Sequence, residues 1–371
     1  MKKIAAFAMF ILAAALTLVA CSAESNENSN KKTPAPKKVS IVATTYPQYD
    51  WLKNVLGDHL NAVNLKLLIK NGTDLHSYKP SAQDIAAIAN ADMVVYVGGE
   101  SDEWIEKALN ATPKDGRVQV NLMEALGDRV KEEEVVEGMQ GEEEHEHHHE
   151  HGDPSASSGT GEHHEHAEAH EDHDHHEHAE EHEDGHHHHE EAENDEHVWL
   201  SLKNAEILVR NLAEALAKLD IAHASEYHMN AALYIAKISA LDAQYRAATD
   251  SASYKTILFG DRFPFRYLVD DYGIKYFAAF VGCSAESEAS FETVAFLAGK
   301  MDSLALPAIF TIDGSNGKIA RAILDASKKS KDALVLTLNS MQSVTDDQMK
   351  SGVDYLSIMQ DNLEVLKKAI K

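Results

Sequence analysis

Short apolar runs rich in β-branched residues recur along the chain, each followed by a turn and then by a helical pattern. This alternation predicts an α/β fold with mostly parallel sheets. The runs form two sets of four, so we expect two α/β lobes, each with a four-stranded sheet. The first set is Ser40–Thr45, Val63–Ile69, Met93–Val97 and Arg117–Val120, and the second is Lys255–Phe259, Ile274–Ala279, Pro307–Ile312 and Ala333–Leu338.

A longer helical segment lies between the two sets. Residues 225–250 space their apolar side chains near 3.6 residues and contain no Gly or Pro. A helix of this length would reach about 39 Å and is longer than most helices in globular proteins. We expect it to connect an N-terminal lobe, residues 40–224, to a C-terminal lobe, residues 251–371. An ordinary helix within one lobe is the alternative.

One segment departs from the pattern because it has too few apolar residues to form a core. Residues 132–196 hold 26 of the chain's 61 acidic residues and none of its 34 Lys and Arg residues. We predict a disordered His/Glu/Asp-rich loop on the N-terminal lobe. The rest of the chain is nearly neutral and offers no basic patch, so nucleic-acid binding is not expected.

The same loop contains 18 of the chain's 23 histidines. Imidazole and carboxylate groups are ligands that borderline divalent cations prefer. We therefore expect the loop to bind metal ions, and a solvated acidic spacer is the alternative. The clustered histidines predicted as auxiliary ligands are His145, His147, His148, His149, His151, His163, His164, His166, His186, His187, His188 and His189.

Two strings in the loop match the His-Glu-x-x-His pattern of metalloproteases, at residues 145–149 and 182–186. That pattern binds zinc only where a stable helix brings both histidines to one face. The surrounding residues are all polar and predict no such helix. No enzymatic activity is therefore expected.

The N-terminus has the composition of a secretion signal. Two lysines precede an apolar run that ends at Ala20, and Leu-Val-Ala before Cys21 resembles a bacterial lipobox. We expect residues 1–20 to be a signal peptide, Cys21 to be lipidated, and residues 21–39 to be a polar tether. The protein would then be extracytoplasmic and anchored by lipid to the bacterial cell membrane. A spanning helix is the alternative, although about 17 apolar residues is the lower limit. Cys283 then remains alone, without a disulfide partner.

Polar side chains follow several of the predicted strands, at the edge where open α/β sheets bind ligands. His76 follows the second strand, His197 ends the acidic loop, and Asp261, Asp313 and Asn339 follow strands of the second lobe. Taken singly, each has an ordinary explanation as a hydrogen-bonded histidine or as a capping or turn residue. Together they offer nitrogen and oxygen ligands on both lobes.

Several motifs stand in a characteristic order: Gly72–Ser81, Ala91–Gly98 with Trp104, Asp195–Leu200 with Asn204, Tyr267–Gly273 and Tyr355–Leu363. In this order they resemble the zinc- and manganese-type solute-binding lipoproteins of bacterial ABC importers. The resemblance runs from Ile41 to the C-terminus and implies two α/β lobes joined by one rigid helix, with the metal between them. It also implies that His76 and His197 are metal ligands. A His-rich loop before the second histidine is typical of the zinc-importing members.

The resemblance weakens in the second lobe. At the family's third ligand position this chain has Arg262, which stays protonated and cannot bind a cation. Asp261 is the nearest candidate. At the fourth position, where some members have Asp, this chain has Asn339, whose amide oxygen is a weaker ligand than a carboxylate. We expect Asp261 and Asn339 to complete the site, with Asp313 or a water as the alternative to Asn339.

The sequence thus leads to a hypothesis of Zn²⁺ capture outside the cytoplasm and delivery to an ABC permease in the cytoplasmic membrane, by a monomer that carries Zn²⁺ as cargo. Nitrogen ligands favour Zn²⁺ over Mn²⁺, which prefers oxygen and is the alternative cargo. The family resemblance also implies a role in cell adhesion. The alternative function is a surface metal buffer or adhesin in which the loop is the active part and no permease is served.

Overall fold

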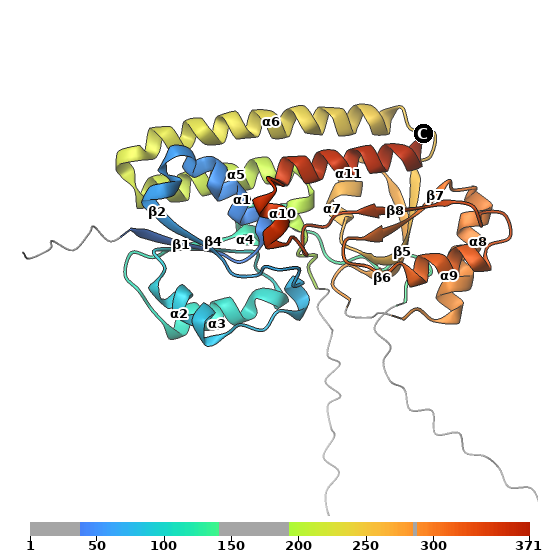
Figure 1. Cartoon of the computed structure of the whole chain (residues 1–371), viewed down its shortest axis with the longest axis horizontal. Coiled ribbons are helices and arrows are strands. Elements are labelled where there is room, and N and C mark those ends of the chain that lie inside the picture. The colour runs from blue at the N-terminus through green and yellow to red at the C-terminus, as the bar shows by residue number, and fades with distance from the viewer. Residues whose placement is uncertain (1–37, 141–192, 285–287) are drawn as a thin grey trace, which may run out of the picture. The chain divides into compact units, whose positions relative to one another are not determined.

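The computed structural model describes residues 38–140, 193–284 and 288–371. In this part of the chain every predicted strand is present, and the strands form two four-stranded parallel sheets (Figure 1), so the predicted fold is confirmed. The predicted signal peptide, most of the tether, Cys21 and the auxiliary loop histidines lie outside these ranges. Among the helices described, none is long and apolar enough to cross a membrane.

Lobe one contains the first sheet, whose strand order is β2-β1-β3-β4. Helices α1 (Tyr46–Leu56) and α5 (Leu202–Leu219) lie over one face, and α2 (Ala82–Asn90) and α3 (Glu103–Ala111) lie over the other (Figure 1). All four residues of β3 are buried, as expected of a central strand covered on both faces. The short helix α4 (Leu122–Leu126) follows the last strand. The strands are β1 (Val39–Ala43), β2 (Val63–Leu67), β3 (Met93–Tyr96) and β4 (Val118–Asn121).

Lobe two contains the second sheet, in the order β6-β5-β7-β8. Its strands are β5 (Thr256–Phe263), β6 (Lys275–Val281), β7 (Ala308–Ile312) and β8 (Leu334–Leu338), and its helices are α7 (Arg266–Tyr272), α8 (Phe291–Leu304), α9 (Lys318–Ala326), α10 (Asp346–Lys350) and α11 (Tyr355–Ile370). Strand β5 continues past the predicted end at Phe259, with a shift in register against β6 between Phe259 and Arg262. Asp261 and Arg262 therefore lie on a strand, not in a turn.

Helix α6 (Ala224–Asp250) has 27 residues and packs against helices of both lobes. Its buried residues recur every three to four positions and include Tyr227, Tyr234, Ile238 and Tyr245. At the lobe-two end, the Tyr245 hydroxyl donates to the Met359 carbonyl of α11 over 2.6 Å. At 1.5 Å per residue the helix is about 40 Å long, and it lies along one side of both sheets (Figure 1).

The two ends of the predicted disordered loop belong to the folded protein. The backbone N–H of Glu133 donates to the Glu193 carbonyl over 2.7 Å, and that of Gln140 donates to the Ala279 carbonyl of β6 over 2.9 Å. Glu134 pairs with Arg266 of lobe two. The prediction of disorder from residue 132 to residue 196 was therefore wrong at both ends, because the backbone there is paired. The remainder, residues 141–192, lies outside the described ranges.

Gly260 of β5 lies where α9 packs closely onto the second sheet. A Cβ atom at this position would lie 2.4 Å from the Ala320 Cα, a backbone atom that cannot move away alone. We predict that Gly260→Ala lowers the free energy of unfolding by about 1–3 kcal/mol through overpacking. Urea unfolding monitored by circular dichroism measures this change.

Gly299 of α8 provides the matched control, because nothing lies within 4 Å of a Cβ built there. Gly299→Ala should raise the free energy of unfolding by about 0.5–1 kcal/mol, since alanine loses less backbone entropy in a helix. A Gly260→Ala protein as stable as the parent would contradict the close approach of β5 and α9.

Candidate metal centre

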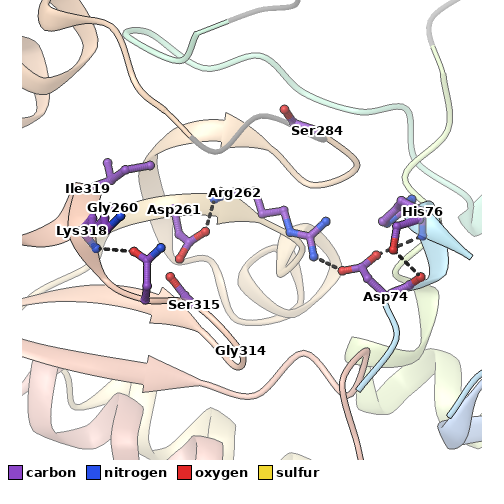
Figure 2. A pocket seen from close by; sticks show the side chains of 12 residues that line it. Asp74, His76, Gly260, Asp261, Arg262, Ser284, Gly314, Ser315, Lys318 and Ile319 are labelled. Carbon is purple, nitrogen blue, oxygen red and sulfur yellow. Dashed lines mark hydrogen bonds and ion pairs between the residues drawn. The ribbon is translucent and has the colours of Figure 1, made fainter. Parts of the chain in front are cut away.

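A cleft of about 370 Å³ opens between the lobes (Figure 2). Lobe one contributes Asp74, His76 and Ser77 to its wall, and lobe two contributes residues from β5, from the turn after β6, and from the turn before α9 and the start of that helix. The lobe-two residues are Gly260, Asp261, Arg262, Ser284, Gly314, Ser315, Asn316, Lys318 and Ile319. Ligands of parallel α/β sheets bind at this kind of edge, beyond the carboxyl ends of the strands.

The two predicted histidines meet beside this cleft. The Nε2 atoms of His76 and His197 lie 3.2 Å apart, although the residues are separated by 121 positions in the chain. His197 is fully buried, and the His76 side chain is 9% exposed. The structure thus brings together the pair that the sequence motifs selected.

Both histidines follow an aspartate by two residues, and this local turn fixes their direction. The Asp74 side chain accepts from the His76 backbone N–H over 3.0 Å, and the Asp195 side chain accepts from the His197 backbone N–H over 2.8 Å. Short aspartate side chains close such turns readily. The repeated Asp-x-His spacing was therefore a sequence signal for how both imidazoles are presented.

The Nδ1 atom of each imidazole has its own hydrogen-bond partner, so the two Nε2 atoms face each other. His197 Nδ1 donates to Asp195 Oδ1 over 3.0 Å, and His76 Nδ1 hydrogen-bonds the Ser101 hydroxyl over 2.8 Å. Such partners orient metal-binding imidazoles and fix their tautomer. The Glu196 carboxylate lies 3.8 Å from His76 Nδ1 and accepts from the Ser101 backbone N–H over 2.8 Å.

Burial keeps the His76 imidazole neutral. Desolvation, followed by the proximity of His197, lowers the pKa of His76 to about 3. A neutral imidazole has the free nitrogen lone pair that binding of a metal ion requires. Two Nε2 atoms 3.2 Å apart, with the carboxylates of Asp195 and Glu196 next to the imidazoles, form a site that attracts a cation.

Cys283 is the third residue at this point, and the sequence reasoning missed it. Among the residues that the structure describes, His76, His197 and Cys283 are the one group of three or more possible metal-binding side chains whose ligand atoms all lie within 4.8 Å of one another. Burial, followed by the charges of Glu133, Asp195 and Glu196, raises the pKa of the Cys283 thiol. The residue follows β6 by two positions, so the strand-edge argument could have found it.

The structure does not bring Asp261 to the histidines. Its Oδ1 accepts from the Arg262 backbone N–H over 3.0 Å, and burial is the main cause that raises the pKa of its carboxyl group. Figure 2 shows the Arg262 side chain extending towards Asp74, with Asp261 on the side of the cleft away from His76. Arg262 pairs with Asp74 across the lobes, and thus the position at which the resemblance implied a third ligand is occupied by an interlobe ion pair.

Asp313 and Asn339 are also directed elsewhere. Asp313 Oδ1 accepts from the Ser340 backbone N–H and, over 2.8 Å, from the Ser340 hydroxyl, and its other oxygen accepts from Ser343. Asn339 Oδ1 accepts from the Met341 backbone N–H over 2.8 Å. Both side chains therefore stabilise the loop after β8, which is the turn and capping role expected of such residues taken singly.

That loop carries a second contact that the sequence reasoning missed. The Gln342 side-chain amide lies 2.8 Å from His197 Nε2, the nitrogen that also faces His76. Strand-edge reasoning stopped at the first polar residue after β8, whereas Gln342 comes four residues after the strand ends. A metal ion bound to His197 Nε2 would have to displace this amide.

Residues 41–369 match the family described as ZnuA, zinc-uptake complex component A, periplasmic. The chain belongs to this family. The match covers nearly all of both lobes, and it confirms the resemblance to metal-importer solute-binding proteins that the sequence motifs indicated.

Two curated relatives illustrate the relationship. The zinc-binding lipoprotein AdcA of Streptococcus pneumoniae is 32% identical over 370 residues, which are 99% of this chain and 61% of that protein. The chain thus spans less than two thirds of that relative's length. The high-affinity zinc uptake system protein ZnuA of Bacillus subtilis is 27% identical over 362 residues, 98% of this chain and 97% of that protein.

Solved structures agree with this assignment. The Zn(II)-bound ZnuA-like domain of Streptococcus pneumoniae AdcA superposes with a TM-score of 0.62 at 26% identity, covering 90% of this chain and 99% of that domain. The periplasmic zinc-binding protein TroA of Treponema pallidum has a TM-score of 0.64 at 21% identity and covers 90% of this chain, which shows a shared fold.

Proposed function

We propose that this protein captures Zn²⁺ outside the cytoplasm and delivers it to an ABC permease, with His76 and His197 as ligands. The observation that carries the proposal is the pair of buried Nε2 atoms 3.2 Å apart beside an interlobe cleft. Each imidazole has its other nitrogen held by a hydrogen bond, an arrangement typical of zinc-binding histidines. The relatives' names, a zinc-binding lipoprotein and a zinc uptake protein, support the same cargo.

The chemistry of the pair favours Zn²⁺ over Mn²⁺. Neutral imidazole suits Zn²⁺, whereas Mn²⁺ prefers carboxylate, carbonyl and water oxygens. The carboxylates that the sequence suggested as further ligands, Asp261 and Asp313, are hydrogen-bonded away from the histidines. These two carboxylates therefore add no oxygen ligands beside the histidines, where a manganese site would require them.

The remaining parts of the chain fit the same function. Lipidation of Cys21 would tether a monomeric protein close to its permease, and residues 21–39 would give it reach. The histidines of residues 141–192 would bind further zinc ions weakly and raise the local zinc concentration near the cleft, in the manner of a linked second binding module. The tight site would lie outside this segment, because His76 and His197 belong to the folded lobe.

A zinc titration tests the site. We replace residues 141–192 by a short Gly/Ser linker, which removes the loop histidines and retains the paired residues at both ends. The shortened protein should bind one Zn²⁺ tightly in competition with a chromophoric chelator. His76→Ala and His197→Ala should each weaken binding by more than about 100-fold, beyond the effect of losing an outer-shell partner.

His228→Ala is the matched control, because its ring is partly exposed on α6 and lies 3.8 Å from Glu214, away from the cleft. This variant should bind zinc like its parent. A shortened protein without a tight site, or a His197→Ala protein with unchanged affinity, would refute the assignment of the two ligands.

A growth experiment separates an importer from a surface metal buffer. In a strain that lacks the gene, we expect growth to fail in zinc-chelated medium and to recover when zinc is added. The shortened protein should restore growth, and the His76→Ala/His197→Ala double variant should not. Normal growth of the deletion strain in chelated medium would favour the buffer.

A further inference from the structure

We propose that Cys283 is the third protein ligand of the captured metal, so that the site consists of two imidazoles from lobe one and a thiolate from lobe two. The inference rests on the proposed function, because it names a ligand of the same site. It replaces the carboxylate or amide ligand expected from lobe two on the sequence alone.

The distances in the cluster are close to those of a zinc site. In a tetrahedral site with Zn–N near 2.0–2.1 Å and Zn–S near 2.3 Å, neighbouring ligand atoms are about 3.3–3.6 Å apart. The two Nε2 atoms are already 3.2 Å apart, and the Cys283 sulfur lies within 4.8 Å of both. A displacement of at most about 1.3 Å would therefore bring the three atoms to coordination geometry.

The local chain is built to bring Cys283 close to His197. Gly282 lies so near the imidazole that a Cβ atom there would be 3.2 Å from His197 Cε1 and 2.9 Å from the Phe263 carbonyl oxygen. Only glycine permits this approach at the end of β6. The Cys283 backbone N–H then donates to Glu133 Oε1 over 2.9 Å, which fixes the turn against the segment that leads from lobe one.

The charges around the sulfur favour a cation at this point. The carboxylates of Glu133, Asp195 and Glu196 all act electrostatically on the thiol. Arg262 is the opposing charge nearby, and its guanidinium pairs with Asp74. When the metal–sulfur bond forms, the S–H bond breaks and its proton passes to solvent, while the divalent ion compensates the thiolate charge. No oxidant or reductant takes part in this step.

A thiolate at this position gives the site a defined preference. Two imidazoles and one thiolate are a ligand set that Zn²⁺ occupies in proteins, and a fourth position remains for water or another small ligand. Manganese binds such a sulfur-containing set poorly, because it prefers oxygen. On this proposal, the Cys283 thiolate makes the site selective for Zn²⁺ over Mn²⁺. It supplies the third ligand in a chain whose Arg262 cannot bind a cation.

Optical titration with Co²⁺ tests the proposal on the full-length chain. Replacing Cys21 by serine leaves Cys283 as the one thiol, since the chain has two cysteines. A thiolate-to-cobalt charge-transfer band should then grow with the first equivalent of Co²⁺, whatever the loop histidines bind. Added Zn²⁺ should abolish the band by displacement.

Two variants decide which lobe-two residue is the ligand. Cys283→Ser should remove the charge-transfer band and weaken binding of the first Zn²⁺ by at least about 10–100-fold. Asp261→Asn should keep both the band and the affinity, because the Asp261 carboxylate is directed away from His76. Circular dichroism of each variant verifies folding. The charge-transfer band of the parent protein tests the thiolate ligand even if a variant fails to fold.

The outcomes separate this inference from the proposed function. If the first Co²⁺ binds tightly without a charge-transfer band, and this binding is lost in His197→Ala, the inference is wrong and the two-histidine site stands. If neither the band nor binding that depends on His197 is found, both are wrong. If Asp261→Asn loses affinity for the first metal ion and Cys283→Ser does not, the third ligand is the Asp261 carboxylate and the inference is wrong.

Discussion

The fixed position of the His197 segment is the constraint on which the site depends. Its imidazole is fully buried, with Nδ1 held by Asp195, so Nε2 is directed towards His76 and the cleft. Three hydrogen bonds with lobe two support this segment. The Tyr267 hydroxyl donates to the Asp195 carbonyl over 2.8 Å, and the Tyr355 hydroxyl donates to the Trp199 carbonyl over 2.8 Å. Trp199 Nε1 in turn donates to the Ser340 carbonyl over 2.9 Å. Such a network of buried, satisfied hydrogen bonds is rigid. On the proposed function, the nitrogen that binds the metal is therefore positioned before any ion arrives.

The same contacts explain how two lobes with separate sheets can share one centre. Lobe one provides the histidines and the Asp195 and Ser101 side chains that orient them. Lobe two provides the tyrosine hydroxyls that support the His197 segment, the thiol of Cys283 and the amide of Gln342. The Arg262–Asp74 pair spans the cleft, so this chain uses Arg262 for an interlobe contact. On the proposed function, metal capture exchanges the Gln342 contact on His197 for a metal bond.

The sequence was sufficient to predict the fold and the proximity of the two histidines. It was insufficient to predict which lobe-two side chains lie beside them. The strands were found because buried parallel strands leave uninterrupted apolar runs, and the pair was found because motifs around His76 and His197 occur in family order. Asp313 and Asn339 were chosen as potential metal ligands, but only the folded loop reveals that they bond to Ser340 and Met341. Cys283 was considered only as a disulfide partner, since nothing in its spacing indicates that the glycine before it approaches His197. Long-range contacts of this kind depend on the packing of two lobes and leave no local pattern.

Anomalous diffraction from crystals of the zinc-loaded protein, recorded at the zinc absorption edge, tests the central claim most directly. The account predicts one strong peak in the interlobe cleft, about 2.0–2.1 Å from the Nε2 atoms of both His76 and His197. A zinc peak elsewhere in the folded lobes, for instance beside Asp261 and Asp313, with none between the two histidines, would contradict it.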